Sequence, residues 1–263
     1  MALTEDDCAR IAEVKTLRAL DVFGHVRGPT GQGWRNLAAL GELEQLSVSG
    51  DFSDMPGEAL LGLAKLQSLD LRACDKLRRQ TLSGFRSLPA LRRLGLAETG
   101  ITDALLREIG TLADLEELDL RSNSRITDAG LAELHRLKKL NSLAVYRIGP
   151  GSLETLRALP SLATLETQEL APVDAGVIDL SPLTSLRSLT LGSSNLDAQG
   201  SVKLPGDLRH LAIGPWWAEK AERVNLGAPL PTSLESVQIL LLWHLRDHEG
   251  RPELGWLGGL PKL

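Results

Sequence analysis

The chain has 263 residues, a formal net charge of −5 and only two cysteines. Its basic residues form no extended cluster, which gives no sign of nucleic-acid binding, and two cysteines are too few for a disulfide framework. No run of about 18 apolar residues is present, so we expect no segment that spans a membrane.

The first predicted element is a helix over residues 4–14. Thr4 fits the N-cap position and Asp7 the third helical position, an arrangement typical of a capping box. We expect residues 1–16 to form an N-terminal capping helix, because the terminal unit of a repeat array needs a polar outer surface. This acidic start lacks an apolar stretch, which predicts that there is no signal peptide and that the protein is cytoplasmic.

Ten copies of a leucine pattern follow, each with leucine, two variable positions, an aliphatic residue, one variable position and usually another aliphatic residue. The copies begin at Leu17, Leu43, Leu66, Leu91, Leu115, Leu140, Leu162, Leu186, Leu208 and Leu234. The alternation predicts one strand with one buried face in each copy. Units of about 24 residues cannot bury that face alone, so the copies predict a stacked solenoid over residues 17–263.

Helices are predicted between successive strands. Residues 101–109 and 126–134 are near copies with apolar residues at helical spacing, and Thr102 and Thr127 fit their N-cap positions. The last two copies are preceded by Leu-Pro dipeptides, for which we expect more extended outer segments. The chain ends at Leu263 in what reads as the start of another repeat, so the C-terminal end looks uncapped.

The pattern resembles that of the leucine-rich repeat family, L-x-x-L-x-L-x-x-N/C-x-L, which recurs roughly every 20 to 29 residues. Its middle copies resemble ribonuclease-inhibitor-like and bacterial members. The resemblance implies an α/β solenoid shaped as a curved horseshoe. Its inner face would be a parallel sheet of about ten strands, and helices or irregular segments would cover the convex side.

The resemblance also implies a role for the ninth position, whose polar side chain bonds to backbone groups of adjacent turns that would otherwise lack partners. Cys74 and Asn123 match this position and Thr99 is a polar substitute. Ile148 and Leu170 depart from it, so we expect less regular turns in the sixth and seventh copies. The ninth and tenth copies depart in the same way.

The fifth and seventh positions of the middle copies are rich in charged and polar residues. Because stacked parallel strands lie about 4.8 Å apart, we expect these side chains, with one eighth-position arginine, to converge on the concave face. The predicted partner-binding residues are Asp70, Arg72, Asp119, Arg121, Tyr146, Arg147, Glu166 and Gln168. Arginine and tyrosine are enriched at interface hot spots. Alternatively, the acid–arginine pairs only solvate this face. If the face binds a partner, charge reversal at Arg72 and Arg121 together should weaken partner capture and leave thermal stability nearly unchanged.

A possible second patch lies near the C terminus, where four of the five tryptophans follow residue 215. Trp216, Trp217, Leu240 and Trp243 could form an apolar contact with another subunit. The alternative is that these residues fill irregular end turns.

The sequence contains no catalytic motif of a known kind. His244 and His248 lack a third ligand, so we expect no metal site and no cofactor. By resemblance, the chain is predicted to be a non-catalytic protein-protein interaction module, a recognition subunit of a complex. The alternatives are an inhibitor or immunity-type protein that neutralises a toxin or effector, a structural homo-oligomer joined through the C-terminal edge, and an enzyme with an unrecognised site.

Overall fold

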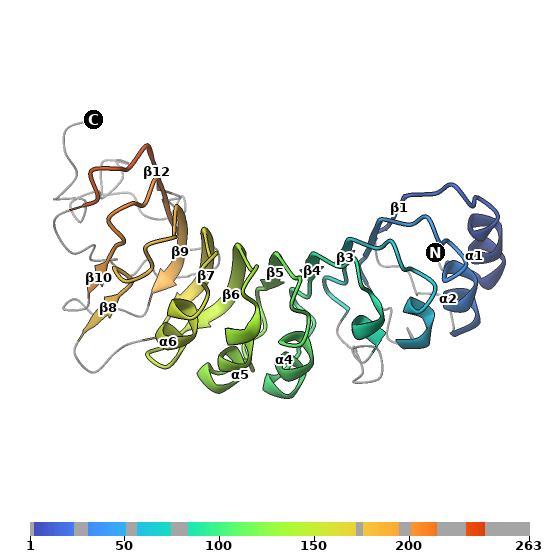
Figure 1. The fold of residues 1–263 in the computed structure, drawn as a ribbon, viewed down its shortest axis with the longest axis horizontal. Coiled ribbons are helices and arrows are strands. Elements are labelled where there is room, and N and C mark those ends of the chain that lie inside the picture. Colours follow the sequence, from blue (N-terminus) through green and yellow to red (C-terminus); the bar gives the residue numbers. More distant parts are fainter. Residues whose placement is uncertain are drawn as a thin grey trace, which may run out of the picture.

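The computed structural model describes residues 3–23, 31–50, 57–74, 84–171, 176–194, 201–214 and 230–239. These residues form a curved solenoid in which strands line one side and helices lie along the opposite side (Figure 1). We call the strand side the concave face and the helix side the convex face. The predicted leucine-rich repeat horseshoe is therefore confirmed.

Each repeat contributes one strand to a ten-stranded parallel sheet, in which the strands follow one another in chain order. The strands β8 and β10 are not part of this sheet. The strands are β1 (Ala19–Val22), β2 (Gln45–Val48), β3 (Ser68–Asp70), β4 (Arg93–Gly95), β5 (Glu117–Leu120), β6 (Ser142–Ile148), β7 (Thr164–Leu170), β9 (Ser188–Ser194), β11 (His210–Ile213) and β12 (Ser236–Ile239). Equivalent positions pair throughout, so Leu69, Leu94 and Leu118 are neighbours although about two dozen residues separate them in the chain.

The convex side changes along the solenoid. It contains α1 (Glu5–Ala12), α2 (Gly31–Leu37), η1 (Gly57–Leu60), η2 (Gly84–Ser87), α4 (Asp103–Ile109), α5 (Asp128–Ala132), η3 (Glu133–Arg136) and α6 (Ser152–Arg157). After α6, the short strands β8 (Val177–Asp179) and β10 (Ser201–Lys203) pair with each other instead. The extended outer segment expected before the ninth repeat is thus present. Within the described ranges, no helix is long and apolar enough to cross a bilayer.

The helix α1 begins where the sequence predicts. Thr4 Oγ1 accepts a hydrogen bond from Asp7 N, and the Asp7 carboxylate accepts one from Thr4 N, which completes the capping box. The helix packs beside α2, and its own residue Cys8 is fully buried. Leu20 and Val22 of β1 are only partly buried, so the capping role of residues 1–16 stays a prediction.

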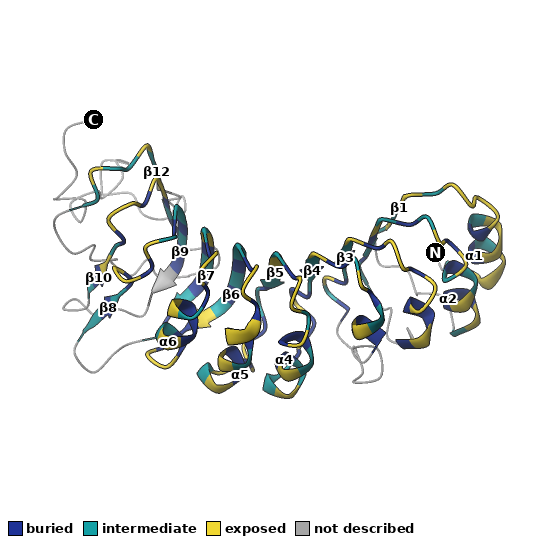
Figure 2. Ribbon diagram, viewed as in Figure 1, coloured by how far each residue is buried: buried dark blue, intermediate teal, exposed yellow. Residues whose placement is uncertain are grey.

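Buried hydrophobic residues, most of them leucine, form one cluster between the sheet and the convex segments. Figure 2 shows buried positions along both the strands and the convex helices. The first and fourth positions of each middle repeat point into this cluster, as Leu115 and Leu118 do with 0% and 2% exposure. Carbonyl groups connect successive turns at the start of each strand. Arg92 O, for example, accepts hydrogen bonds from both Glu116 N and Glu117 N.

The ninth position behaves as the resemblance implies in the third to fifth repeats. Asn123 is buried, and its amide donates to the carbonyl oxygens of Leu96, Leu120 and Arg121. Its Oδ1 accepts from Thr99 Oγ1 and Ile101 N. The eighth residue of each of these repeats, Ala73, Glu98 and Ser122, has a positive φ near 60° that turns the chain out of the strand.

The sixth and seventh repeats differ from this arrangement. Instead of the irregular turns expected from Ile148 and Leu170, β6 and β7 continue as strands of seven residues, against three or four in β3, β4 and β5. An apolar residue at the ninth position cannot bond to the neighbouring backbone, whereas a longer strand satisfies those groups through the sheet.

Candidate functional site

Three carboxylates form one row across the middle of the concave face. The strand register places Asp70 beside Gly95, Gly95 beside Asp119, Asp119 beside Ala144, and Ala144 beside Glu166. Acidic residues therefore occupy every second strand of the row, and the intervening strands carry small residues. The predicted convergence of Asp70, Asp119 and Glu166 on one face is confirmed.

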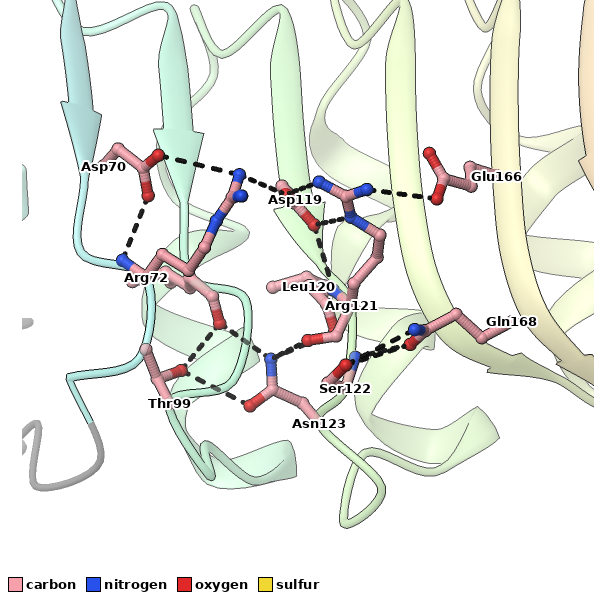
Figure 3. A network of polar contacts seen from close by, with 11 residues as sticks. Asp70, Arg72, Thr99, Asp119, Leu120, Arg121, Ser122, Asn123, Glu166 and Gln168 are labelled. Carbon is pink, nitrogen blue, oxygen red and sulfur yellow. Dashed lines mark hydrogen bonds and ion pairs between the residues drawn. The ribbon is translucent and has the colours of Figure 1, made fainter. Parts of the chain in front are cut away.

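Two arginines join these carboxylates (Figure 3). Arg72 Nη2 lies 3.8 Å from Asp70 Oδ2 and 3.7 Å from Asp119 Oδ2. Arg121 donates from Nε and Nη2 to the two oxygens of Asp119 at 2.9 and 2.6 Å, and from Nη1 to Glu166 Oε1 at 3.2 Å. We call these five residues, Asp70, Arg72, Asp119, Arg121 and Glu166, the charge ladder.

The small residues between the acids make these long bridges possible. Alternate strands of a parallel sheet are about 10 Å apart, so each arginine must cross a strand to reach its second carboxylate. A Cβ atom added at Gly95 would lie 2.5 Å from Asp70 Oδ1. Glycine at this position therefore leaves the space that the Asp70 carboxylate occupies.

Local backbone geometry fixes the direction of each Asp-x-Arg segment. Asp70 Oδ1 accepts a hydrogen bond from Arg72 N at 3.0 Å, and Asp119 Oδ1 accepts one from Arg121 N at 3.1 Å. In both repeats the residue after the arginine has a positive φ. The aspartates are thus held by the main chain before their side chains meet the arginines.

The two arginines differ in how much solvent reaches them. The side chain of Arg72 is 49% exposed, and that of Arg121 is 29% exposed. The hydrogen-bonded Asp119 carboxylate raises the pKa of Arg121, as does the charge of Glu166, while burial acts in the opposite direction. Arg121 is therefore a fixed positive charge between two acids.

A hollow of about 280 Å³ lies in the concave face above Gly95 and Ala144. Its charged lining comprises Asp70, Arg93, Glu117, Asp119, Arg121 and Glu166. Four carboxylates face two guanidinium groups of the lining, and Arg72 forms ion pairs with Asp70 and Asp119, so an excess of one negative charge remains. Sequence reasoning missed Arg93 and Glu117, although the third position of each repeat alternates onto the same face as the fifth.

Three of the predicted binding residues, Tyr146, Arg147 and Gln168, are not part of the charge ladder. Tyr146 is partly exposed, and burial, followed by the neighbouring Glu169 carboxylate, raises its pKa. Arg147 is exposed and, in the part of the chain that the structure describes, forms no ion pair with the ladder. Gln168 is only 5% exposed, and its Oε1 accepts a hydrogen bond from Ser122 N at 2.6 Å. Its side-chain amide ties β7 to the turn that follows β5.

The second predicted patch cannot be placed, because Trp216, Trp217, Leu240 and Trp243 lie outside the described residues. His244 and His248 also lie outside them. His210 is exposed, and its ring contacts Ser236 Oγ at 2.9 Å. In the seven described ranges, no three histidine, cysteine or acidic side chains are grouped as metal ligands.

Comparisons with solved structures show where this fold recurs. An internalin from Listeria monocytogenes, InlF, is 20% identical with a TM-score of 0.62, over 95% of this chain and 67% of that one. Internalin C2 from the same organism is 21% identical with a TM-score of 0.52, over 90% of this chain and 84% of that one. A TLR13–ssRNA13 complex matches at 21% identity and a TM-score of 0.54, over 91% of this chain and 38% of that one. These similarities show the fold alone.

The search of curated proteins finds no match to this chain. The model of the family described as "Leucine-rich repeat region" matches residues 47–213, which is more than half of the sequence. That interval contains every member of the charge ladder and the full row of paired strands around it. The chain belongs to the leucine-rich repeat family.

Proposed function

We propose that the chain is a non-catalytic interaction module whose concave face, from β3 to β7, binds a partner protein. The charge ladder is the observation that carries this proposal. It presents guanidinium and carboxylate groups in fixed positions on an open face, so little side-chain entropy is lost when a partner binds. The exposed ion pairs of Arg72 contribute little to folding, which leaves recognition as a reason for them.

A protein fits this face better than a nucleic acid does. The TLR13 structure contains a single-stranded RNA, which makes RNA a specific alternative to test. A phosphate backbone needs clustered positive charge, whereas the hollow has an excess of carboxylates. The charge ladder, in which acids and arginines alternate, instead suits a protein surface whose charges complement it.

The proposal is tested with a photo-crosslinking residue, benzoylphenylalanine, at one position of each face. Thr164 is exposed at the start of β7 on the concave face, and Ala132 is exposed at the end of α5 on the convex face. We expect the Thr164 variant to capture a specific protein from the native host and the Ala132 variant to capture none. Capture from Ala132 alone, or of RNA alone from Thr164, would contradict concave protein binding.

The partner also decides between narrower roles. We propose a recognition subunit of a complex, located in the cytoplasm, where Cys8 and Cys74 would stay as the free thiols they are in the structure. A captured toxin or effector would favour the inhibitor alternative. A homo-oligomer joined through the C-terminal edge would instead appear as a larger species in light scattering.

A further inference from the structure

The hollow of the concave face has a specific chemistry. We propose that it receives one lysine or arginine side chain of the partner protein. This inference rests on the proposed function, since it assumes that a protein docks on this face. It adds the class of side chain that the middle of the face selects.

The size of the hollow suits one side chain. Sites for drug-sized ligands usually occupy about 300–1,000 Å³, and this hollow of about 280 Å³ falls below that range. Gly95 and Ala144 form part of its lining and keep it open between the rows of longer side chains. A larger residue at either position would fill the space that a partner needs.

The charge of the hollow suits a cation. Its four carboxylates are only partly neutralised by Arg93 and Arg121 of the lining and by Arg72, which pairs with Asp70 and Asp119. Asp119 has both of its oxygens bound by Arg121, so it has little capacity for another donor. Arg121 bonds to only one oxygen of Glu166, which leaves Oε2 available.

Glu117 supplies the most accessible acceptor. It is exposed on β5, and its carboxylate forms no hydrogen bond or ion pair with another described residue. Its register neighbours are Arg93 on β4 and Ser142 on β6, both in the lining of the hollow. A lysine or arginine placed between Glu117 and Glu166 would form charge-assisted hydrogen bonds with two carboxylates that are not saturated.

An acidic side chain would fit poorly here. It would face four carboxylates, and Arg121 is already held between Asp119 and Glu166. Like charges placed together at an interface disfavour the wrong partner. The hollow therefore selects basic over acidic side chains.

The test uses the full chain and four pentapeptides that differ only at the central residue, which is arginine, lysine, glutamine or glutamate. Binding is followed by NMR through the backbone amides of Gly95 and Ala144. We expect the arginine or lysine peptide to shift these two amides and to bind at least about fivefold more tightly than the glutamine peptide. The glutamate peptide should not shift them.

Substitutions in the lining test whether the basic peptide binds in the hollow. The double variant Glu117→Gln and Glu166→Gln should weaken binding of the basic peptide at least about fivefold. The charge-matched control Glu133→Gln and Glu154→Gln changes two acids outside the hollow, on η3 and α6, and should bind normally. Ala144→Leu should abolish the shift at Gly95 without changing the net charge, and the glutamine double variant still tests the site if Ala144→Leu does not fold.

Equal binding of all four peptides, or shifts confined to other amides, would overturn the proposed role of the hollow. That result would leave concave binding intact if the crosslinker at Thr164 still captured a protein. If the basic peptides show no preference and the crosslinker at Thr164 captures no protein, the proposed function is rejected together with the inference.

Discussion

Arg121, directly after β5, and Glu166 on β7 form an ion pair of 3.2 Å, although 45 residues separate them in the chain and β6 lies between β5 and β7. The bridge forms because the residue between Asp119 and Glu166 in the row is Ala144, whose side chain ends at Cβ. Arg121 thereby joins three strands of the sheet. Arg121 thus lies on the proposed binding face and also has a structural role. The sequence pattern alone does not tell these two roles apart.

Replacing the two arginines should affect stability differently. Arg72→Glu removes long, exposed contacts and should change the free energy of unfolding by less than about 1 kcal/mol. Arg121→Glu removes hydrogen bonds to two carboxylates and adds a third acid between them, so we expect a loss of about 1–3 kcal/mol or more. Urea unfolding followed by circular dichroism measures both. If both variants lose less than about 1 kcal/mol in the free energy of unfolding, Arg121 has no greater structural role than Arg72.

The buried Asn123 should be one of the most sensitive polar positions. Asn123→Ala removes the donor to three carbonyl groups and the acceptor for Ile101 N, so we expect a loss of about 2–4 kcal/mol. Asn123→Thr should lose less, because Thr99 serves at the same position one repeat earlier. Chemical denaturation of the two variants gives the difference, and an equal loss in both would show that the hydrogen bonds do not decide the effect.

Gln168 should behave as a structural residue. In Gln168→Met the backbone N–H of Ser122 loses its acceptor, and we expect a loss of about 1–3 kcal/mol in the free energy of unfolding. The matched control is Gln45→Met, because Gln45 is an exposed glutamine on β2 and its replacement should change little. If Gln168→Met unfolds like the unsubstituted chain but loses its partner, Gln168 contacts the partner as the sequence predicts.

The two thiols should be unreactive in the folded protein. Burial first, and then the charges of Asp7 and Glu5, raise the pKa of Cys8 to about 11. Folding thus favours the protonated thiol, and this contribution to stability is present below the unfolded pKa of about 8.5 and is lost as pH rises towards 11.

Ellman's reagent at pH 8 should therefore react slowly with Cys8 and with the buried Cys74 in native conditions, and rapidly in guanidinium chloride. Fast native reaction of one thiol, assigned by mass spectrometry, would indicate local opening of its segment. The variants Cys8→Ser and Cys74→Ser identify which cysteine reacts in each phase.

Much of the candidate site could be predicted from the sequence. A repeat of about 24 residues places equivalent positions side by side, so Asp70, Asp119 and Glu166 had to share one face. The alternation within each strand also assigns Arg93 and Glu117 to that face, although their part in a hollow could not be predicted. Whether the second patch around Trp216 exists is untested, because it lies outside the described residues.

Other features depend on contacts between repeats that no single repeat contains. The sequence shows Gln168 at an outward position of its strand, but its side chain reaches Ser122 in the turn that follows β5, two strands away. It shows Ile148 and Leu170 as departures from a polar position, but not that β6 and β7 are strands of seven residues.

By itself, the sequence determined the solenoid, the parallel register and the residues on the concave face, because these follow from a short period repeated along the chain. Only the tertiary structure decided which charges meet, which polar side chains are used internally and where a hollow remains. The physical reason is that periodicity fixes where each Cα lies, whereas the direction and reach of each side chain depend on the size of its neighbours on the adjacent strands.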